Sequence, residues 1–180
     1  MVLSIDGRKS TFAYDAEYWK NKKTYNYELE GKPPFEHKSK AYYRVPFNEI
    51  NVLMLTGKKS MKNLVIKRKS KSLYHLLADG KYKPTRFGRK RWKKLIDNSS
   101  LQKNCNREGF NVYNRLMRVR IGIIANQENN CDTPDSRLGI GAGSNDKARG
   151  PNRSVGNEAI GYQPDRGKRK TTAWGFILVR

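Results

Sequence analysis

A polar run at residues 126–141 carries the side chains of this 180-residue chain that are best suited to bind a ligand. It combines amides, carboxylates, a cysteine and glycines, and is too polar to form a core. Such oxygens suit a hard cation such as calcium, which takes about six to eight of them, or a polyhydroxy ligand. The candidate residues are Asp132 and Asp135 for a metal and Asn129 and Asn130 for a ligand. The alternative is an ordinary turn system in which the acids accept backbone N–H bonds.

A second chemistry comes from positive charge. The chain has 38 Lys and Arg against 16 Asp and Glu, a formal net charge of +22. Residues 51–100 contain 15 basic and 2 acidic residues, so 13 of the 22 excess charges lie there. Such a field attracts nucleic acid, sulfated glycans, acidic lipid surfaces or acidic proteins. The densest part supplies the predicted polyanion-binding residues Arg86, Arg89, Lys90, Arg91, Lys93 and Lys94. The alternative is a solvated basic face.

Several segments have patterns that predict the elements around these residues. Alternation and then a continuous apolar run at 118–124 predict a strand that delivers the polar loop to a sheet end. Residues 49–55 and 62–67 predict a hairpin, and 171–180 predicts a buried terminal strand. Residues 72–80 predict a helix capped by Ser72, and 89–96 a basic helix.

Two further segments are less regular. The aromatic residues and turn signals of 12–47 favour short strands over helices. Residues 142–172 contain hardly any apolar residues and are predicted to form a long irregular loop. Together these patterns predict one mixed α+β domain covering 1–180.

Two cysteines, Cys105 and Cys131, allow one disulfide or none, and their spacing does not fit structural zinc. The N-terminus lacks the apolar core of a signal peptide, and no stretch approaches 18 apolar residues, so a soluble chain without a membrane span is expected. No nucleophile-elbow, zincin, phosphate-loop or paired-carboxylate motif is present, so an enzyme is not expected. The triplets at 98–100 and 152–154 fit N-glycosylation, which matters only if the chain is exported.

Several segments resemble the C-terminal part of secreted fibrinogen-related, intelectin-like proteins of cnidarians, including those of the coral skeletal matrix. The likeness covers 72–180 better than 1–71, and its segments are 73–80, 92–96, 100–111, 129–137, 156–159 and 175–179. The resemblance implies an extracellular domain with a fibrinogen C-terminal-like α+β fold. The opening segment of the family is missing from this sequence, and Val155 stands where the family commonly has a cysteine. A Cys105–Cys131 pairing then becomes an option.

In the intelectin branch, the resemblance implies calcium-dependent binding of vicinal diols on glycans. By position, Asp132, Asp135 and Asp146 would be calcium ligands. Asn157 and Glu158 would form a polar pair, with Asn157 as a ligand-binding residue and Glu158 able to complete the calcium shell. Local turn or capping roles are the alternative for this pair. Pro134 stands where an intelectin ligand side chain would lie, which weakens that route to sugar binding.

Two hypotheses follow. The first is a non-enzymatic extracellular recognition or matrix protein that binds glycans or acidic polyanions, with calcium as a cofactor. The second is an intracellular basic protein that binds RNA or DNA nonspecifically through residues 58–94.

Overall fold

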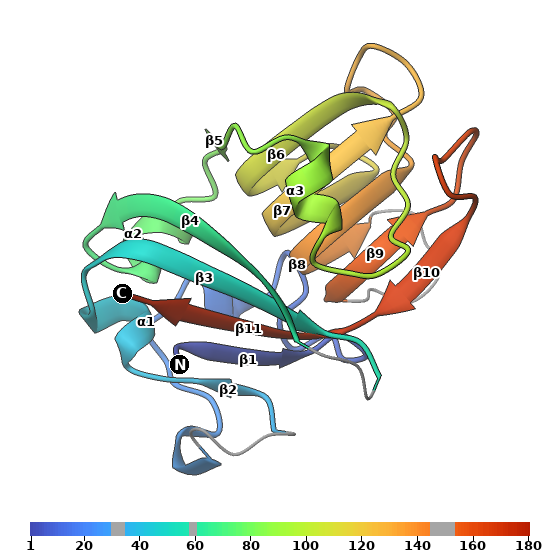
Figure 1. Cartoon of the computed structure of the whole chain (residues 1–180). Helices are drawn as coiled ribbons and strands as arrows, with labels where there is room; N and C mark the ends of the chain where they lie inside the picture. The colour runs from blue at the N-terminus through green and yellow to red at the C-terminus, as the bar shows by residue number, and fades with distance from the viewer. Residues whose placement is uncertain (30–34, 58–60, 145–153) are drawn as a thin grey trace.

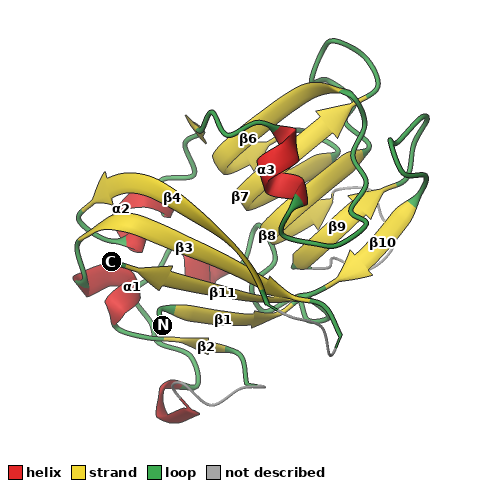
Figure 2. Cartoon of the chain, viewed as in Figure 1, coloured by secondary structure: helices red, strands yellow, loops and turns green. Residues whose placement is uncertain are grey.

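Two antiparallel sheets, one of five strands and one of six, form the described part of the chain (Figures 1 and 2). A computed structural model describes residues 1–29, 35–57, 61–144 and 154–180. The expected α+β, fibrinogen C-terminal-like class is therefore wrong. The structure is β-rich because the predicted helices are only five residues long, whereas glycine-rich and polar stretches that looked irregular pair as strands.

The five-stranded sheet brings the two chain ends together, because β1 pairs with β11 through Leu3 and Ile177. In spatial order its strands are β2 (His37–Lys38), β1 (Leu3–Asp6), β11 (Trp174–Val179), β3 (Phe47–Leu55) and β4 (Lys62–Ser70). The predicted hairpin is confirmed as β3 and β4, and the predicted terminal strand as β11. Alternation explains the hairpin, since Ile50 and Val52 are buried on β3 and Leu64 and Ile66 on β4.

The six-stranded sheet is centred on β7, the strand predicted at 118–124. Its strands in spatial order are β10 (Arg169–Thr172), β9 (Val155–Ala159), β8 (Ser136–Ser144), β7 (Met117–Asn126), β6 (Asn104–Tyr113) and β5 (Lys83–Pro84). The predicted loop at 126–141 is thus shorter than expected, because β8 begins at Ser136. Gly122 and Gly139 pair across β7 and β8 so closely that a Cβ on Gly139 would lie 2.4 Å from the Ile121 carbonyl oxygen. The glycines permit close strand contact here.

The loop predicted at 142–172 is also corrected. Its described parts include the rest of β8, all of β9 and all of β10, while 145–153 lie outside the described residues. β9 is hard to predict because its Asn157 and Glu158 are polar yet buried. Only Ala173 separates β10 from β11, so the chain passes directly from one sheet to the other.

The helices are α1 (Ala41–Arg44), α2 (Leu73–Leu77) and α3 (Arg89–Lys93), with 3-10 turns η1 (Glu17–Trp19) and η2 (Tyr27–Leu29). Both predicted helices exist, and the Ser72 side chain accepts a hydrogen bond from the His75 N–H as the cap of α2. The short strands expected at 12–47 are mostly wrong. Its described residues are largely turns and short helices around a buried aromatic cluster, in which the ring centres of Phe12 and Trp19 are 5.9 Å apart.

A disulfide joins Cys105 at the start of β6 to Cys131 in the loop between β7 and β8. Disulfides persist in oxidising environments, which is the setting that this bond indicates. None of the helices in the described ranges is long and apolar enough to cross a membrane.

Candidate polyanion-binding site

The start of α3 is fixed by a buried carboxylate from β6. Glu108 accepts hydrogen bonds from the Gly88 N–H at 2.7 Å, the Phe87 N–H at 3.0 Å and the Trp92 indole N–H at 2.7 Å. Burial acts to raise the pKa of the Glu108 carboxyl, but these bonds and one from Thr85 outweigh it and hold the pKa below its usual value. A carboxylate at this end also complements the exposed N–H groups of a helix start. The basic helix therefore has a defined position.

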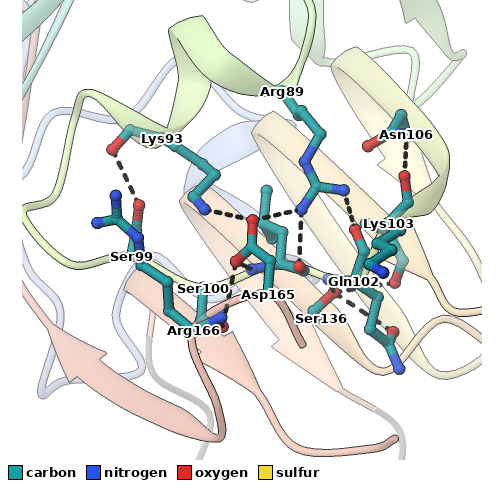
Figure 3. A network of polar contacts seen from close by, with 12 residues as sticks. Arg89, Lys93, Ser99, Ser100, Gln102, Lys103, Asn106, Ser136, Asp165 and Arg166 are labelled. Carbon is teal, nitrogen blue, oxygen red and sulfur yellow. Dashed lines mark hydrogen bonds and ion pairs between the residues drawn. The ribbon is translucent and has the colours of Figure 1, made fainter. Parts of the chain in front are cut away.

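Asp165, in the loop between β9 and β10, holds two of the predicted polyanion-binding residues (Figure 3). Its carboxylate accepts hydrogen bonds from Arg89 at 2.7 Å and from the Lys93 ammonium. Burial acts to raise the pKa of Asp165, and the bonds from Lys93, Leu101 and Arg89 lower it on balance. Arg89 also donates to the backbone oxygens of Gln102 and Leu101. Arg89 and Lys93 thus form internal ion pairs with Asp165, and their side chains are only 20% and 15% exposed.

An open groove of about 410 Å³ lies beside this ion cluster. Lys90, Lys94 and Arg166 line it and are exposed, and none of the three forms an ion pair with any described residue. Lys90 and Lys94 are four positions apart and therefore neighbours on a helical face. Arg166 reaches the same groove because its backbone N–H donates to the Ser100 hydroxyl at 3.1 Å. We call these three residues the groove cations.

The rest of the groove is built from the segment that follows α3. Its remaining lining residues are Lys93, Ile96, Asp97, Asn98 and Ser99. Asp97 is the acid within this lining, and it pairs with Lys62 of β4 at 3.6 Å. The groove therefore keeps a positive balance.

The two other predicted polyanion-binding residues, Arg86 and Arg91, are exposed but do not line the groove. The Arg91 guanidinium lies 5.6 Å from the centre of the Phe87 ring. Both cations can add to the surrounding field without contacting a ligand held in the groove.

The acids and amides of the predicted calcium loop lie between the end of β7 at Asn126 and the start of β8 at Ser136. Asn130 and Asp132 form a local turn in which the Asp132 N–H donates to the Asn130 side-chain oxygen at 3.0 Å, while Asn129 is an exposed loop residue. The backbone of Asp135 is held by Gln102, whose side-chain oxygen accepts from the Asp135 N–H at 3.1 Å.

Glu158 and Asn157 have structural partners on β9. Glu158 forms a buried ion pair with Arg137 at 2.7 Å. Asn157 accepts from the Ser100 N–H and donates to the carbonyl oxygens of Ser100 and Arg137. Asp146 lies outside the described residues.

Within ranges 1–29, 35–57, 61–144 and 154–180, no group of three or more His, Cys, Asp or Glu could hold a metal ion. Glu158 is moreover neutralised by Arg137. Calcium binding stays a prediction.

Sequence reasoning identified Lys90 and Lys94 from charge density but missed Arg166, Asp165 and Glu108. The basic composition of 166–170 was a usable signal for Arg166. Nothing local marks Asp165, which is 72 residues from Lys93 in the chain.

Comparison with known proteins gives no match for this chain among protein families, curated proteins or solved structures. The likeness to fibrinogen-related proteins therefore stays a prediction from residues.

Proposed function

We propose that this protein is a non-enzymatic extracellular recognition protein that binds a sulfated glycan through the groove beside α3. The observation that carries the proposal is the convergence of Lys90, Lys94 and Arg166 on one groove, all exposed and without an ion-pair partner among the described residues. Ammonium and guanidinium groups form charge-assisted hydrogen bonds with sulfate oxygens.

The cluster below the groove supports this role. Arg89 and Lys93 share the carboxylate of Asp165, and Glu108 fixes the start of the same helix. Holding α3 from both sides pre-organises the groove cations, so less conformational freedom is lost when a ligand binds. The net charge of +22 adds a long-range field that attracts a polyanion to this surface.

Two observations favour a sulfated glycan over a nucleic acid. The disulfide between Cys105 and Cys131 fits an oxidising compartment, where extracellular glycans are met. Single-stranded nucleic acid is usually held by bases stacked on exposed aromatic rings. Here Trp92 is fully buried and its indole N–H is used by Glu108, while Phe87 is half-buried beside Arg91. No aromatic ring is among the described residues that line the groove, so the groove itself offers charge rather than a stacking platform.

The test compares two triple variants with the same loss of charge. One removes the groove cations as Lys90→Gln, Lys94→Gln and Arg166→Gln. The control removes three exposed lysines on and beside β4, as Lys67→Gln, Lys69→Gln and Lys71→Gln. Exposed ion pairs contribute about 0.2–1 kcal/mol each, so we expect the groove variant to bind heparin roughly tenfold more weakly than the control.

Competition by polyanions of other classes identifies the ligand. Immobilised heparin should release the protein to soluble heparin at lower concentrations than to DNA of equal total charge. Equal weakening by the two triple variants would contradict the groove assignment. Binding of DNA without binding of heparin would replace the glycan with nucleic acid.

A further inference from the structure

The turn that follows α3 carries the triplet Asn98-Ser99-Ser100 at the edge of the basic groove. Asn-X-Ser is the acceptor pattern for N-glycosylation in proteins that pass through a secretory compartment. The Cys105–Cys131 disulfide independently indicates an oxidising compartment.

The side chain of Asn98 is accessible, as the acceptor of an N-linked glycan must be. It is exposed, and its side chain has no hydrogen bond to any residue in the described ranges. Its backbone φ is +57°, a left-handed conformation that asparagine tolerates better than most residues. A sugar on this side chain would replace no contact of the folded protein.

The two serines of the triplet fix the turn from the inside. The Ser99 hydroxyl donates to the Lys93 carbonyl oxygen at 2.9 Å, and the Ser100 N–H donates to the Asn157 side chain at 2.8 Å. Both serines are buried, and Figure 3 shows Ser100 beside Asp165 and Arg166. The exposed asparagine is thus anchored at a constant position relative to the groove.

We propose that Asn98 is an N-glycosylation site and that the glycan covers the groove and weakens polyanion binding there. The second half of this inference rests on the proposed function. Asn98 itself lines the groove together with Lys90, Lys94 and Arg166, so a bulky neutral sugar at its amide would compete for the same space.

The modification is a group transfer from an oligosaccharide linked to a lipid pyrophosphate. A bond forms between the sugar C1 and the Asn98 side-chain nitrogen, and the bond between C1 and the pyrophosphate oxygen breaks. The amide nitrogen loses one proton, and the lipid pyrophosphate leaves. The donor and the transferase come from the secretory compartment.

The first experiment reads the modification by mass. The full chain is expressed behind a secretion signal in glycosylating eukaryotic cells, with Asn152→Gln to remove the second triplet. Peptide mapping is expected to find a glycan on Asn98, and adding Asn98→Gly should remove all N-glycan. Glycine is chosen because it adopts a φ of +57° without strain and adds no charge. A secreted Asn152→Gln protein with unmodified Asn98 would overturn the inference.

The second experiment reads the groove. The Asn152→Gln protein is made in the glycosylating host and in an oxidising bacterial periplasm, which adds no such glycan. The glycosylated form is expected to elute from heparin at lower salt, and the Asn98→Gly, Asn152→Gln protein at the same salt from both hosts. A modified Asn98 with unchanged elution would overturn the covering role. Failure of the unglycosylated protein to bind heparin would instead contradict the proposed function and leave the mass result standing.

Discussion

The carboxylate of Glu108 on β6 accepts a hydrogen bond of 2.7 Å from the indole N–H of Trp92 in α3. The same carboxylate accepts from two backbone N–H groups at the start of the helix. A helix of five residues does not form stably in water by itself. The positions of Lys90 and Lys94 therefore depend on a contact between Glu108 and the fully buried Trp92.

Replacing Glu108 with alanine should destabilise the protein strongly. Hydrogen bonds to charged groups contribute about 1.5–3 kcal/mol, and buried donors left unpaired cost about 1–3 kcal/mol. We expect a loss of at least about 3 kcal/mol in the free energy of unfolding, measured by urea denaturation. Glu17→Ala is the control because the Glu17 side chain is 79% exposed, and it should change stability by less than about 0.5 kcal/mol. Equal effects of both variants would show that Glu108 is not an anchor.

Acid should weaken the fold through Glu108 and Asp165. Both carboxyls have a folded pKa below the ordinary values of 4.5 and 3.8. Their stabilising contribution is complete above those values and is lost as the pH falls through the lower folded pKa values. As the pH falls below about 4.5, the melting temperature of the wild type should decrease. The decrease should be smaller for Glu108→Gln over the same pH range. Burial raises the pKa of Glu36, so protonation of Glu36 favours the folded state as the pH falls. This opposing effect is present in both proteins. Parallel acid curves for the two proteins would contradict this assignment.

Alkaline pH tests a second buried charge. Lys38 donates to the Tyr18 and Asn21 carbonyl oxygens at 2.6 and 2.8 Å, and burial lowers its pKa from 10.5 to about 8. Between these values the unfolded chain binds more protons at Lys38, so this residue's contribution to stability rises with pH. Relative to Lys38→Met, the wild type should gain about 2 kcal/mol between pH 8 and 10. A constant difference in unfolding free energy would contradict the lowered pKa.

The disulfide should contribute strongly to stability. Cys105 and Cys131 are 26 residues apart, and closing a loop of that length corresponds to about 3.5 kcal/mol in the chain-entropy treatment. Reduction should lower the melting temperature of the wild type and leave a Cys105→Ser, Cys131→Ser variant unchanged. Mass spectrometry with and without reductant verifies the bond. A melting temperature that reductant leaves unchanged in both proteins would contradict the stabilising role of the disulfide.

Local pattern predicted part of the fold. The β3–β4 hairpin follows from alternation, with Ile50 and Ile66 facing the core, and α2 follows from its Ser72 cap. The β9 strand has no such pattern. Its polar residues are buried because Arg137 neutralises Glu158 and Ser100 satisfies Asn157, and neither partner is adjacent in sequence.

The site divides in the same way. Charge density predicted Lys90 and Lys94, since a basic stretch is visible without knowledge of the fold. The pairing of Lys93 with Asp165 depends on the topology, which brings the β9–β10 loop to α3. This pairing distinguishes Arg89 and Lys93, which Asp165 holds, from the exposed groove cations. Composition does not contain that distinction.

The central claim is that the groove cations hold a sulfated glycan. Its most direct test is heparin affinity measured by titration at several salt concentrations for the wild type and both triple variants. Each lost contact should reduce the slope of log affinity against log salt by roughly one, so the groove variant should show a slope smaller by roughly three. The Lys67, Lys69 and Lys71 control should keep a slope close to that of the wild type. A groove variant with the wild-type slope, or a control with the larger reduction, would contradict the account.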